Sequence, residues 1–290
     1  MAMKLGLCTM IYLDYVTLEE AIRRTAKAGF EGIDMWADSP HLDPLIKDSA
    51  YRKAIKKQVA DEGMEICSLS VNGGSLNRRY NFSYSKDAVR RETLDYYKLC
   101  VDLAAEVGAP RINLISGHMM SDTTRDQAWK WNYENMAAVC EYAGKNNVTM
   151  CMHTLTPSES RVVVTLDDAI DMHQQINMSS CKIMIDTADQ NITDPDLTTA
   201  VQKVSKHLHY VHVSDNTGDG LGLVHMIPGK GTVNWDLFIC ALRDAGYDGY
   251  ITAQIYAAHP IDPNSWVSAT YNHLAGVLAN CGVHKARARH

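Results

Sequence analysis

The sequence predicts an α/β fold of the (β/α)8, or TIM, barrel class that forms a single domain over residues 1–290. Eight short apolar runs rich in strand-forming residues alternate with longer amphipathic patterns of helical period. The 290 residues are also enough for such a barrel, which typically takes ~250. Because every strand is followed by a helical crossover, the strands are expected to be parallel and able to close.

Each element is predicted from its own pattern and its terminal residues. The expected strands are Lys4–Cys8, Gly32–Trp36, Glu65–Val71, Arg111–Ile115, Thr149–His153, Lys182–Asp186, Tyr210–Ser214 and Tyr250–Ile255. The clearest helices are Thr17–Ala28, Ala50–Glu62, Lys86–Val107, Asp126–Asn146 and Asn234–Ala245, with Thr124 or Asp126 as a candidate N-cap. Gly29, Gly108 and Gly246 follow three of them, where helices commonly end.

A weak internal repeat supports a βα unit that is used more than once. Residues 28–34, AGFEGID, resemble residues 245–251, AGYDGYI, and both read as a helix end, a glycine stop and a strand start. The alternative fold is an open doubly wound sheet, which is disfavoured because no glycine-rich phosphate loop follows the first strand. The least patterned stretches, Asn72–Ser85 and Asp215–Gly231, are expected to be loops at the catalytic face.

Composition restricts the class of partner. A net charge of -6 and a pI near 6.0 argue against nucleic acid and against a membrane surface. No secretory leader and no apolar run of membrane-spanning length are found, so we expect a cytoplasmic protein that acts on a small molecule. None of the 8 cysteines forms a CxxC pair, and they are expected to be buried thiols.

Four of the later strands end in polar residues. His153, Asp186, His212 and Gln254 close the fifth to eighth strands, and polar groups at strand C-termini of such a barrel point into the active-site mouth. A single histidine at a strand end is more often structural, but four side chains on adjacent strands can converge. Imidazole, carboxylate and amide oxygen suit a divalent ion, so the sequence predicts a metal site here.

Several local motifs resemble those of the xylose-isomerase-like TIM barrels, and specifically the ketose and fructoselysine 3-epimerases. They are residues 154–160, TLTPSES, residues 184–187, MIDT, residues 212–215, HVSD, residues 225–231, HMIPGKG, and residues 246–250, GYDGY. The HxIPGxG loop points to the fructoselysine branch. The resemblance implies one bound divalent ion, with manganese expected and cobalt, zinc, iron or magnesium as alternatives, and an assembly into homo-oligomers.

The resemblance also implies roles for individual residues. Relatives hold the metal with Glu, Asp, His and Glu, and the matching positions here are His153, Asp186, His212 and Gln254, so the first and last differ. Glu159 matches a substrate-binding glutamate, and Asp189 stands where the ketose epimerases carry a substrate-binding histidine. His153 and Glu159 are therefore the expected catalytic residues. Asp189, His118, His225 and Trp36 complete the expected substrate contacts. Tyr80, Asn81 and Tyr84 could reach a conjugated group, whereas Asp34 is expected to have structural partners.

The two departures change the expected mechanism. In the relatives two glutamates exchange a proton on opposite faces of the sugar, and a glutamine cannot do this because an amide has no useful pKa. The charge of the ion and its four ligands changes from -1 in the relatives to +1 here, which favours a stronger Lewis acid. We therefore expect proton abstraction next to a keto-sugar carbonyl, through an enediolate, by an isomerase or a lyase.

Alternatives remain open at this point. One is the catalytic subunit of a C-glycoside deglycosidase, which resembles the same barrel, eliminates the aglycone from a 3-oxo-glycoside and pairs with a small second subunit. Another is a conventional ketose or fructoselysine 3-epimerase. A metal-dependent endonuclease and a non-catalytic sugar-binding barrel are disfavoured, the first by the acidic balance of the chain.

Overall fold

Eight parallel strands form a closed barrel in the order β1 to β8, with each strand hydrogen-bonded to its sequence neighbour and β8 to β1. The computed structural model describes residues 3–71, 79–220, 225–256 and 261–283. The strands are β1 (Lys4–Cys8), β2 (Gly32–Trp36), β3 (Glu65–Ser70), β4 (Arg111–Ile115), β5 (Thr149–His153), β6 (Cys181–Asp186), β7 (Leu208–Val213) and β8 (Tyr250–Ala253).

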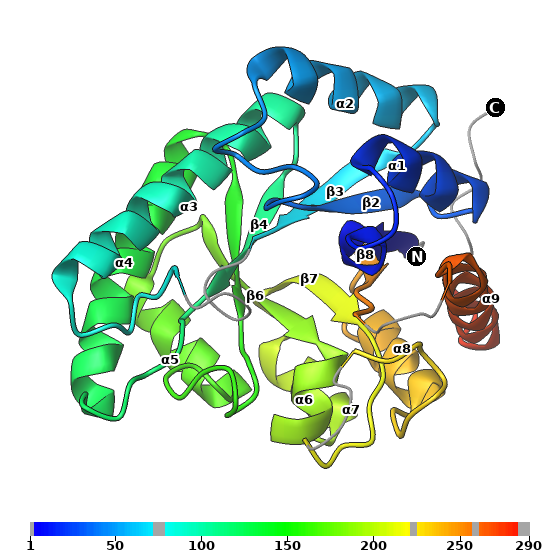
Figure 1. Ribbon diagram of the computed structural model, residues 1–290. Coiled ribbons are helices and arrows are strands. Elements are labelled where there is room, and N and C mark those ends of the chain that lie inside the picture. Colours follow the sequence, from blue (N-terminus) through cyan, green and yellow to red (C-terminus); the bar gives the residue numbers. More distant parts are fainter. Residues whose placement is uncertain (1–2, 72–78, 221–224, 257–260, 284–290) are drawn as a thin grey trace.

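Helices surround the strands as an outer layer (Figure 1). They are the short 3-10 helix η1 (Thr9–Tyr12), α1 (Leu18–Lys27), α2 (Ser49–Asp61), α3 (Asp87–Val107), α4 (Arg125–Lys145), α5 (Leu166–Ile176), α6 (Thr187–Thr193), α7 (Leu197–Val204), α8 (Trp235–Asp244) and α9 (Asn264–Asn280). The predicted (β/α)8 barrel is thus confirmed. No helix within the described residues has the length and apolarity needed to cross a membrane.

The predicted element bounds are close to the observed ones, and the main correction concerns β8. This strand ends at Ala253, two residues before the predicted end, so Gln254 lies just beyond it. The backbone amide of Gln254 still donates to the Val213 carbonyl at 3.0 Å, which fixes the Gln254 backbone against the end of β7. β6 and β7 begin earlier than predicted, at Cys181 and Leu208, because their first residues already pair with neighbouring strands.

Helix ends follow the predicted signals in most cases. The Thr124 side chain accepts from the Gln127 amide and caps α4, which settles the choice between Thr124 and Asp126. Gly29, Gly108 and Gly246 have φ angles of 95°, 84° and 83°, which a glycine adopts without steric cost. All eight cysteines are free and seven are buried, as the sequence predicts.

One buried carboxylate, Asp215, fastens both ends of the long connection between β7 and α8. Its Oδ1 accepts from the Asn216 and Val233 amides at 3.0 and 3.1 Å. Its Oδ2 accepts from the Gly229 amide at 2.8 Å and from Trp235 Nε1 at 3.0 Å. Because Asp215 is fully buried, these four hydrogen bonds replace its hydration shell. We call this set the Asp215 clasp.

The Asp215 clasp leaves no room for a side chain at Gly231. A Cβ atom there would lie 2.1 Å from the Asn216 carbonyl oxygen and 2.3 Å from Asp215 Oδ1. We expect Gly231→Ala to lower the free energy of unfolding by about 1–3 kcal/mol, since both atoms are held by hydrogen bonds. Urea denaturation would measure this. Gly276→Ala is the matched control, because nothing lies within 4 Å of its Cβ and alanine favours the α9 helix. A stabilised Gly231→Ala protein would contradict the steric argument.

Candidate metal and substrate site

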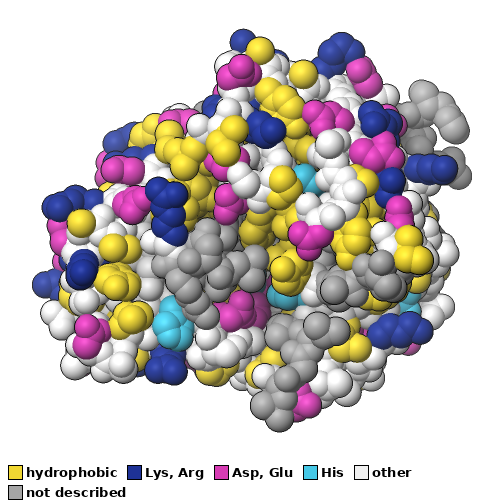
Figure 2. Space-filling view, in the orientation of Figure 1, with side chains coloured by type: hydrophobic (Ala, Val, Ile, Leu, Met, Phe, Trp, Pro, Cys, Tyr) yellow, Lys and Arg dark blue, Asp and Glu magenta, His cyan; other side chains and the backbone are white. Residues whose placement is uncertain are grey.

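The four predicted ligand residues all lie at the C-terminal end of the barrel. His153 ends β5, Asp186 ends β6, His212 is the penultimate residue of β7, and Gln254 follows β8. Their side chains are buried, with exposed fractions from 0 to 5%. In the space-filling view, histidine and acidic side chains lie among hydrophobic ones near the middle of the face (Figure 2). Buried titratable groups of this kind require either partners or an ion.

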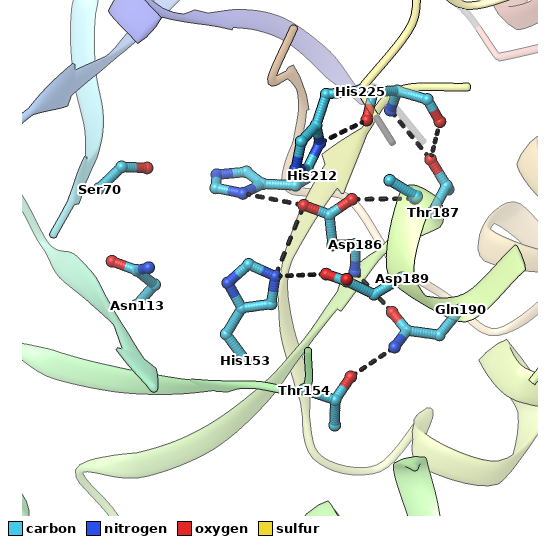
Figure 3. Close-up of polar contacts among 12 residues, drawn as sticks. Ser70, Asn113, His153, Thr154, Asp186, Thr187, Asp189, Gln190, His212 and His225 are labelled. Carbon is cyan, nitrogen blue, oxygen red and sulfur yellow. Dashed lines mark hydrogen bonds and ion pairs between the residues drawn. The ribbon is translucent and has the colours of Figure 1, made fainter. Parts of the chain in front are cut away.

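Asp186 lies at the centre of the cluster, between the two histidine rings (Figure 3). Its Oδ2 is 3.5 Å from His153 Nε2 and 3.7 Å from His212 Nδ1. Its Oδ1 accepts from the Ala188 amide at 3.0 Å and thereby caps α6. Although burial opposes it, the contacts with His153 and His212 hold the pKa of Asp186 well below its usual range. Asp186 is therefore an anionic group with one oxygen held by the fold and one facing the histidines.

Each predicted ligand residue carries a buried polar atom without a hydrogen bond inside the described ranges. Asp186 Oδ2, His212 Nδ1, Gln254 Oε1 and His153 Nδ1 are buried and have no hydrogen-bond partner among the described residues. Donor atoms that share one ion at about 2.1 Å lie roughly 3.0–3.4 Å apart, close to the two separations around Asp186 Oδ2. The group of His153, Asp186 and Asp189 also has ligand atoms that all lie within 4.8 Å of one another. The residues present thus fit a divalent ion.

Asp34 on β2 fixes the orientation of the His212 ring through a contact with its Nε2 atom. Its Oδ2 lies 2.8 Å from His212 Nε2 and accepts from Tyr210 and Ser70 hydroxyls at 3.0 Å each. With Nε2 facing this carboxylate, Nδ1 is left to face Asp186, an arrangement typical of histidine ligands in metal sites. Asp34 thus has the structural partners that the sequence predicts, but its link to His212 is a role that sequence reasoning missed.

We expect Asp34→Asn to weaken divalent-metal binding by about 10–100-fold, because the asparagine no longer holds His212 by charge and hydrogen bond together. Calorimetric titration of the metal-free protein with Mn²⁺ would measure it. Asp61→Asn is the matched control, since Asp61 is an exposed partner of Lys57 on α2. Equal Mn²⁺ affinities in the unaltered protein, Asp34→Asn and Asp61→Asn would contradict the orienting role of Asp34.

His153 lies between two carboxylates rather than one. Its Nε2 is 3.0 Å from Asp189 Oδ2, closer than it is to Asp186. Burial lowers the pKa of His153, but Asp186 and Asp189 outweigh this and raise it to about 10. Burial, assisted by Asp186, raises the pKa of Asp189 to about 6. Asp189 therefore belongs to the cluster, and at neutral pH its carboxylate is balanced by the His153 imidazolium, so the sum with a divalent ion stays at the expected +1.

Three predicted substrate residues lie close to this cluster. Glu159 accepts from Thr156 Oγ1 at 3.1 Å, and its charge contributes to the raised pKa of Asp189. His225 Nδ1 lies 3.0 Å from Ser214 Oγ, next to Asp186 and His212 in Figure 3. His118 Nδ1 lies 3.2 Å from the Glu159 carbonyl oxygen, so it links the loop after β4 to the loop after β5.

Most of the other residues that were expected to contact substrate pack against the rest of the fold instead. Trp36 is 5% exposed and packs against Cys8 and Met10, so it forms part of an apolar wall. The expectation for Tyr80 and Asn81 is corrected: Tyr80 is buried and stacks on Tyr96 with ring centroids 3.8 Å apart. The Asn81 side chain donates to the His118 carbonyl and accepts from the Ser83 amide, which occupies it within the fold. Tyr84 is half-buried.

The sequence profile of the family described as Xylose isomerase-like TIM barrel matches residues 22–276. The chain belongs to this family. The match covers seven of the eight strands, β2 to β8, and so includes every predicted metal ligand. The family resemblance predicted from the motifs is therefore confirmed.

Individual relatives are sugar epimerases. The chain is 26% identical over 277 residues to fructoselysine 3-epimerase of Shigella flexneri, covering 95% of this chain and 98% of the relative. It is 23% identical to D-psicose 3-epimerase of Ruminiclostridium cellulolyticum, covering 80% and 76%. The crystal structure of 3-keto-D-glucoside 4-epimerase from E. coli has the same fold, with a TM-score of 0.77, 18% identity and coverage of 96% and 99%. These matches confirm the prediction that the chain is related to enzymes that act on keto-sugars.

Proposed function

We propose that this protein is a divalent-metal-dependent sugar epimerase or isomerase that removes a proton next to the carbonyl of a keto-sugar or keto-sugar conjugate. The observation that carries the proposal is the set of unpartnered donor atoms at the ends of β6, β7 and β8: Asp186 Oδ2, His212 Nδ1 and Gln254 Oε1. Leaving such atoms buried without a hydrogen bond is costly, and an ion would give Asp186 Oδ2 and His212 Nδ1, which lie 3.7 Å apart, a shared partner. Gln254, just after the neighbouring strand β8, is the proposed third ligand. The epimerase activities named for the relatives support the choice of substrate class.

Asp186, His212 and Gln254 would hold the ion, and Asp34 would keep the His212 ring in place. When bound, a divalent ion supplies Lewis-acid polarisation of the sugar carbonyl and stabilises negative charge on its oxygen. Manganese is the ion we propose, because the donor set is of nitrogen and oxygen without a thiolate. Cobalt, zinc, iron and magnesium remain the alternatives that a metal analysis would distinguish.

His153 is the proposed general base. A divalent ion at Asp186 would offset the negative charges that raise the pKa of His153 and would thereby favour its neutral form. In that form Asp189, which faces Nε2 at 3.0 Å, favours the tautomer that donates from Nε2 and leaves a lone pair on Nδ1. Nδ1 has no partner among the described residues, so it is available for the proton of a substrate carbon. The alternative is that Nε2 is a fourth metal ligand, for which its 3.5 Å separation from Asp186 Oδ2 is suitable. Glu159 is proposed to hold a sugar hydroxyl or to relay a proton.

The glutamine at position 254 favours a second candidate, elimination from a 3-oxo-glycoside by a C-glycoside deglycosidase. An amide cannot return a proton to the opposite face of the sugar, so the chain lacks the pair of carboxylates that a symmetric exchange uses. Elimination needs a single base and a leaving group, which His153 and the metal-bound sugar would provide. In that case a small second subunit is expected to complete the enzyme.

The decisive experiment follows solvent deuterium into the substrate. Protein loaded with Mn²⁺ is incubated in D2O with a panel of ketoses, a fructosyl-amine conjugate and a 3-oxo-glycoside, and the carbon-bound deuterium is measured by NMR. We expect exchange that disappears after chelation and returns with Mn²⁺. The products separate the two candidates, since an epimerase yields a second sugar and a lyase releases the aglycone. Exchange that persists in metal-free protein would overturn the proposal.

A further inference from the structure

A second group of polar residues lies at the opposite end of the barrel, where the strands begin. Arg111 is the first residue of β4, and His209 is the second residue of β7. A cavity of about 200 Å³ lies beside them and is also lined by Ser205, Gly249 and Asp248. The site described above is formed at the C-terminal strand ends, so this cavity is separate from it.

Two nitrogen atoms of the Arg111 guanidinium lack a hydrogen-bond partner in the part of the chain that the structure describes. Nε and Nη1 are buried, and no atom of the described residues forms a hydrogen bond with either. The guanidinium carbon Cζ lies 5.2 Å from the centroid of the Tyr210 ring, which is a cation–π contact. A cation–π contact compensates only part of the cost of burying a guanidinium. The arginine therefore lacks the acceptors that a buried side chain of this kind normally has.

Among the described residues of the lining, the other titratable groups leave Arg111 as the one cation. Burial, assisted by the charges of Arg111 and Lys182, lowers the pKa of His209 to about 4. The carboxylate in the lining belongs to Asp248, which is exposed and so is screened by water. A small anion within the cavity would meet the Arg111 guanidinium and a neutral histidine, with the exposed carboxylate of Asp248 at the rim.

We propose that this cavity binds a small oxyanion of the size of inorganic phosphate, held by the guanidinium of Arg111. Guanidinium nitrogens form paired, charge-assisted hydrogen bonds with two oxygens of such an anion. The volume of about 200 Å³ suits one tetrahedral group, because pockets for larger organic ligands take roughly 300–1,000 Å³. Ser205 and His209 are polar groups of the same lining that can orient the anion.

The test is calorimetric titration of the full-length protein with inorganic phosphate at constant ionic strength set by chloride. We expect saturable binding that Arg111→Gln weakens by at least about 10-fold, the effect of losing hydrogen bonds to a charged group. The phosphate affinity of Arg111→Lys should lie between those of the unaltered protein and Arg111→Gln, since lysine keeps the charge but loses the paired hydrogen bonds. Arg91→Gln is the matched control, because Arg91 is an exposed residue on α3 paired with Asp87.

Two further variants keep the proposal falsifiable if Arg111→Gln does not fold. Asp248→Asn, at the exposed rim, should tighten phosphate binding because a like charge is removed. Asp186→Asn, at the other end of the barrel, should leave it unchanged. Absence of saturable binding would mean that the cavity holds water only. Binding that persists in Arg111→Gln, or that Asp186→Asn abolishes, would place the anion elsewhere, and each of these results would overturn the proposal.

Discussion

Asp186→Asn is expected to lower metal-dependent turnover by about 10²–10⁴-fold, because a Lewis acid supplies several kcal/mol of transition-state stabilisation. Asparagine keeps the side-chain oxygen that caps α6, so the variant should fold. It removes the negative charge that faces His153 and His212. Bound metal, measured by elemental analysis after gel filtration, should fall with the activity.

A matched control for this variant is Asp168→Asn. Asp168 is also an aspartate at the start of a helix, where it completes the capping box of α5, but it lies outside the cluster. It should keep full metal content and turnover. If Asp186→Asn binds as much metal as the unaltered protein, the ion is not held by Asp186, and the prediction is contradicted.

His153→Gln is expected to reduce deuterium exchange into the substrate by about 10²–10⁴-fold while metal content is retained, since general-base catalysis contributes that much. The physical reason is that Asp189 faces Nε2 and leaves Nδ1 as the free basic atom. Asp189→Asn should lower exchange in the same direction, because the tautomer is no longer fixed by a carboxylate. Both rates would be measured by NMR in D2O.

Metal content decides between the two roles of His153. Loss of metal together with exchange in His153→Gln would identify it as a ligand and contradict its assignment as the base. The matched control is His207→Gln, because His207 pairs with His173 away from the cluster and should affect neither quantity.

The strands were predictable because their apolar runs and glycine stops are local properties. Six of the eight strands, from Lys4–Cys8 to Cys181–Asp186, begin and end within one residue of the predicted bounds. The start of β7 and the end of β8 each differ from the prediction by two residues. A strand extends as far as its partner pairs with it, and no local sequence pattern records that limit. Position at a strand end was likewise enough to find Asp186 and His212.

What escaped the sequence depends on contacts between distant segments. Asp34 meets His212 across 178 residues, and nothing in the β2 sequence indicates that contact. Asp189 was expected only as a substrate contact, because its place one helical turn after Asp186 does not reveal that it reaches His153. Tyr80 and Asn81 were expected to reach a conjugated group of the substrate, but Tyr80 stacks on Tyr96 and the Asn81 side chain donates to the His118 carbonyl.

The Asp215 clasp has a consequence for changing the range of substrates by design. It ties residues 216, 229, 233 and 235 to one carboxylate, so the two ends of the connection are held together regardless of what lies between them. Loop exchange with relatives can therefore be confined to residues 217–224, which lie between positions 216 and 229, both bonded to Asp215. Exchanges that include position 229 or 231 would instead disturb the Asp215 clasp itself, because the Gly229 amide donates to Asp215 and a side chain at position 231 would collide with it.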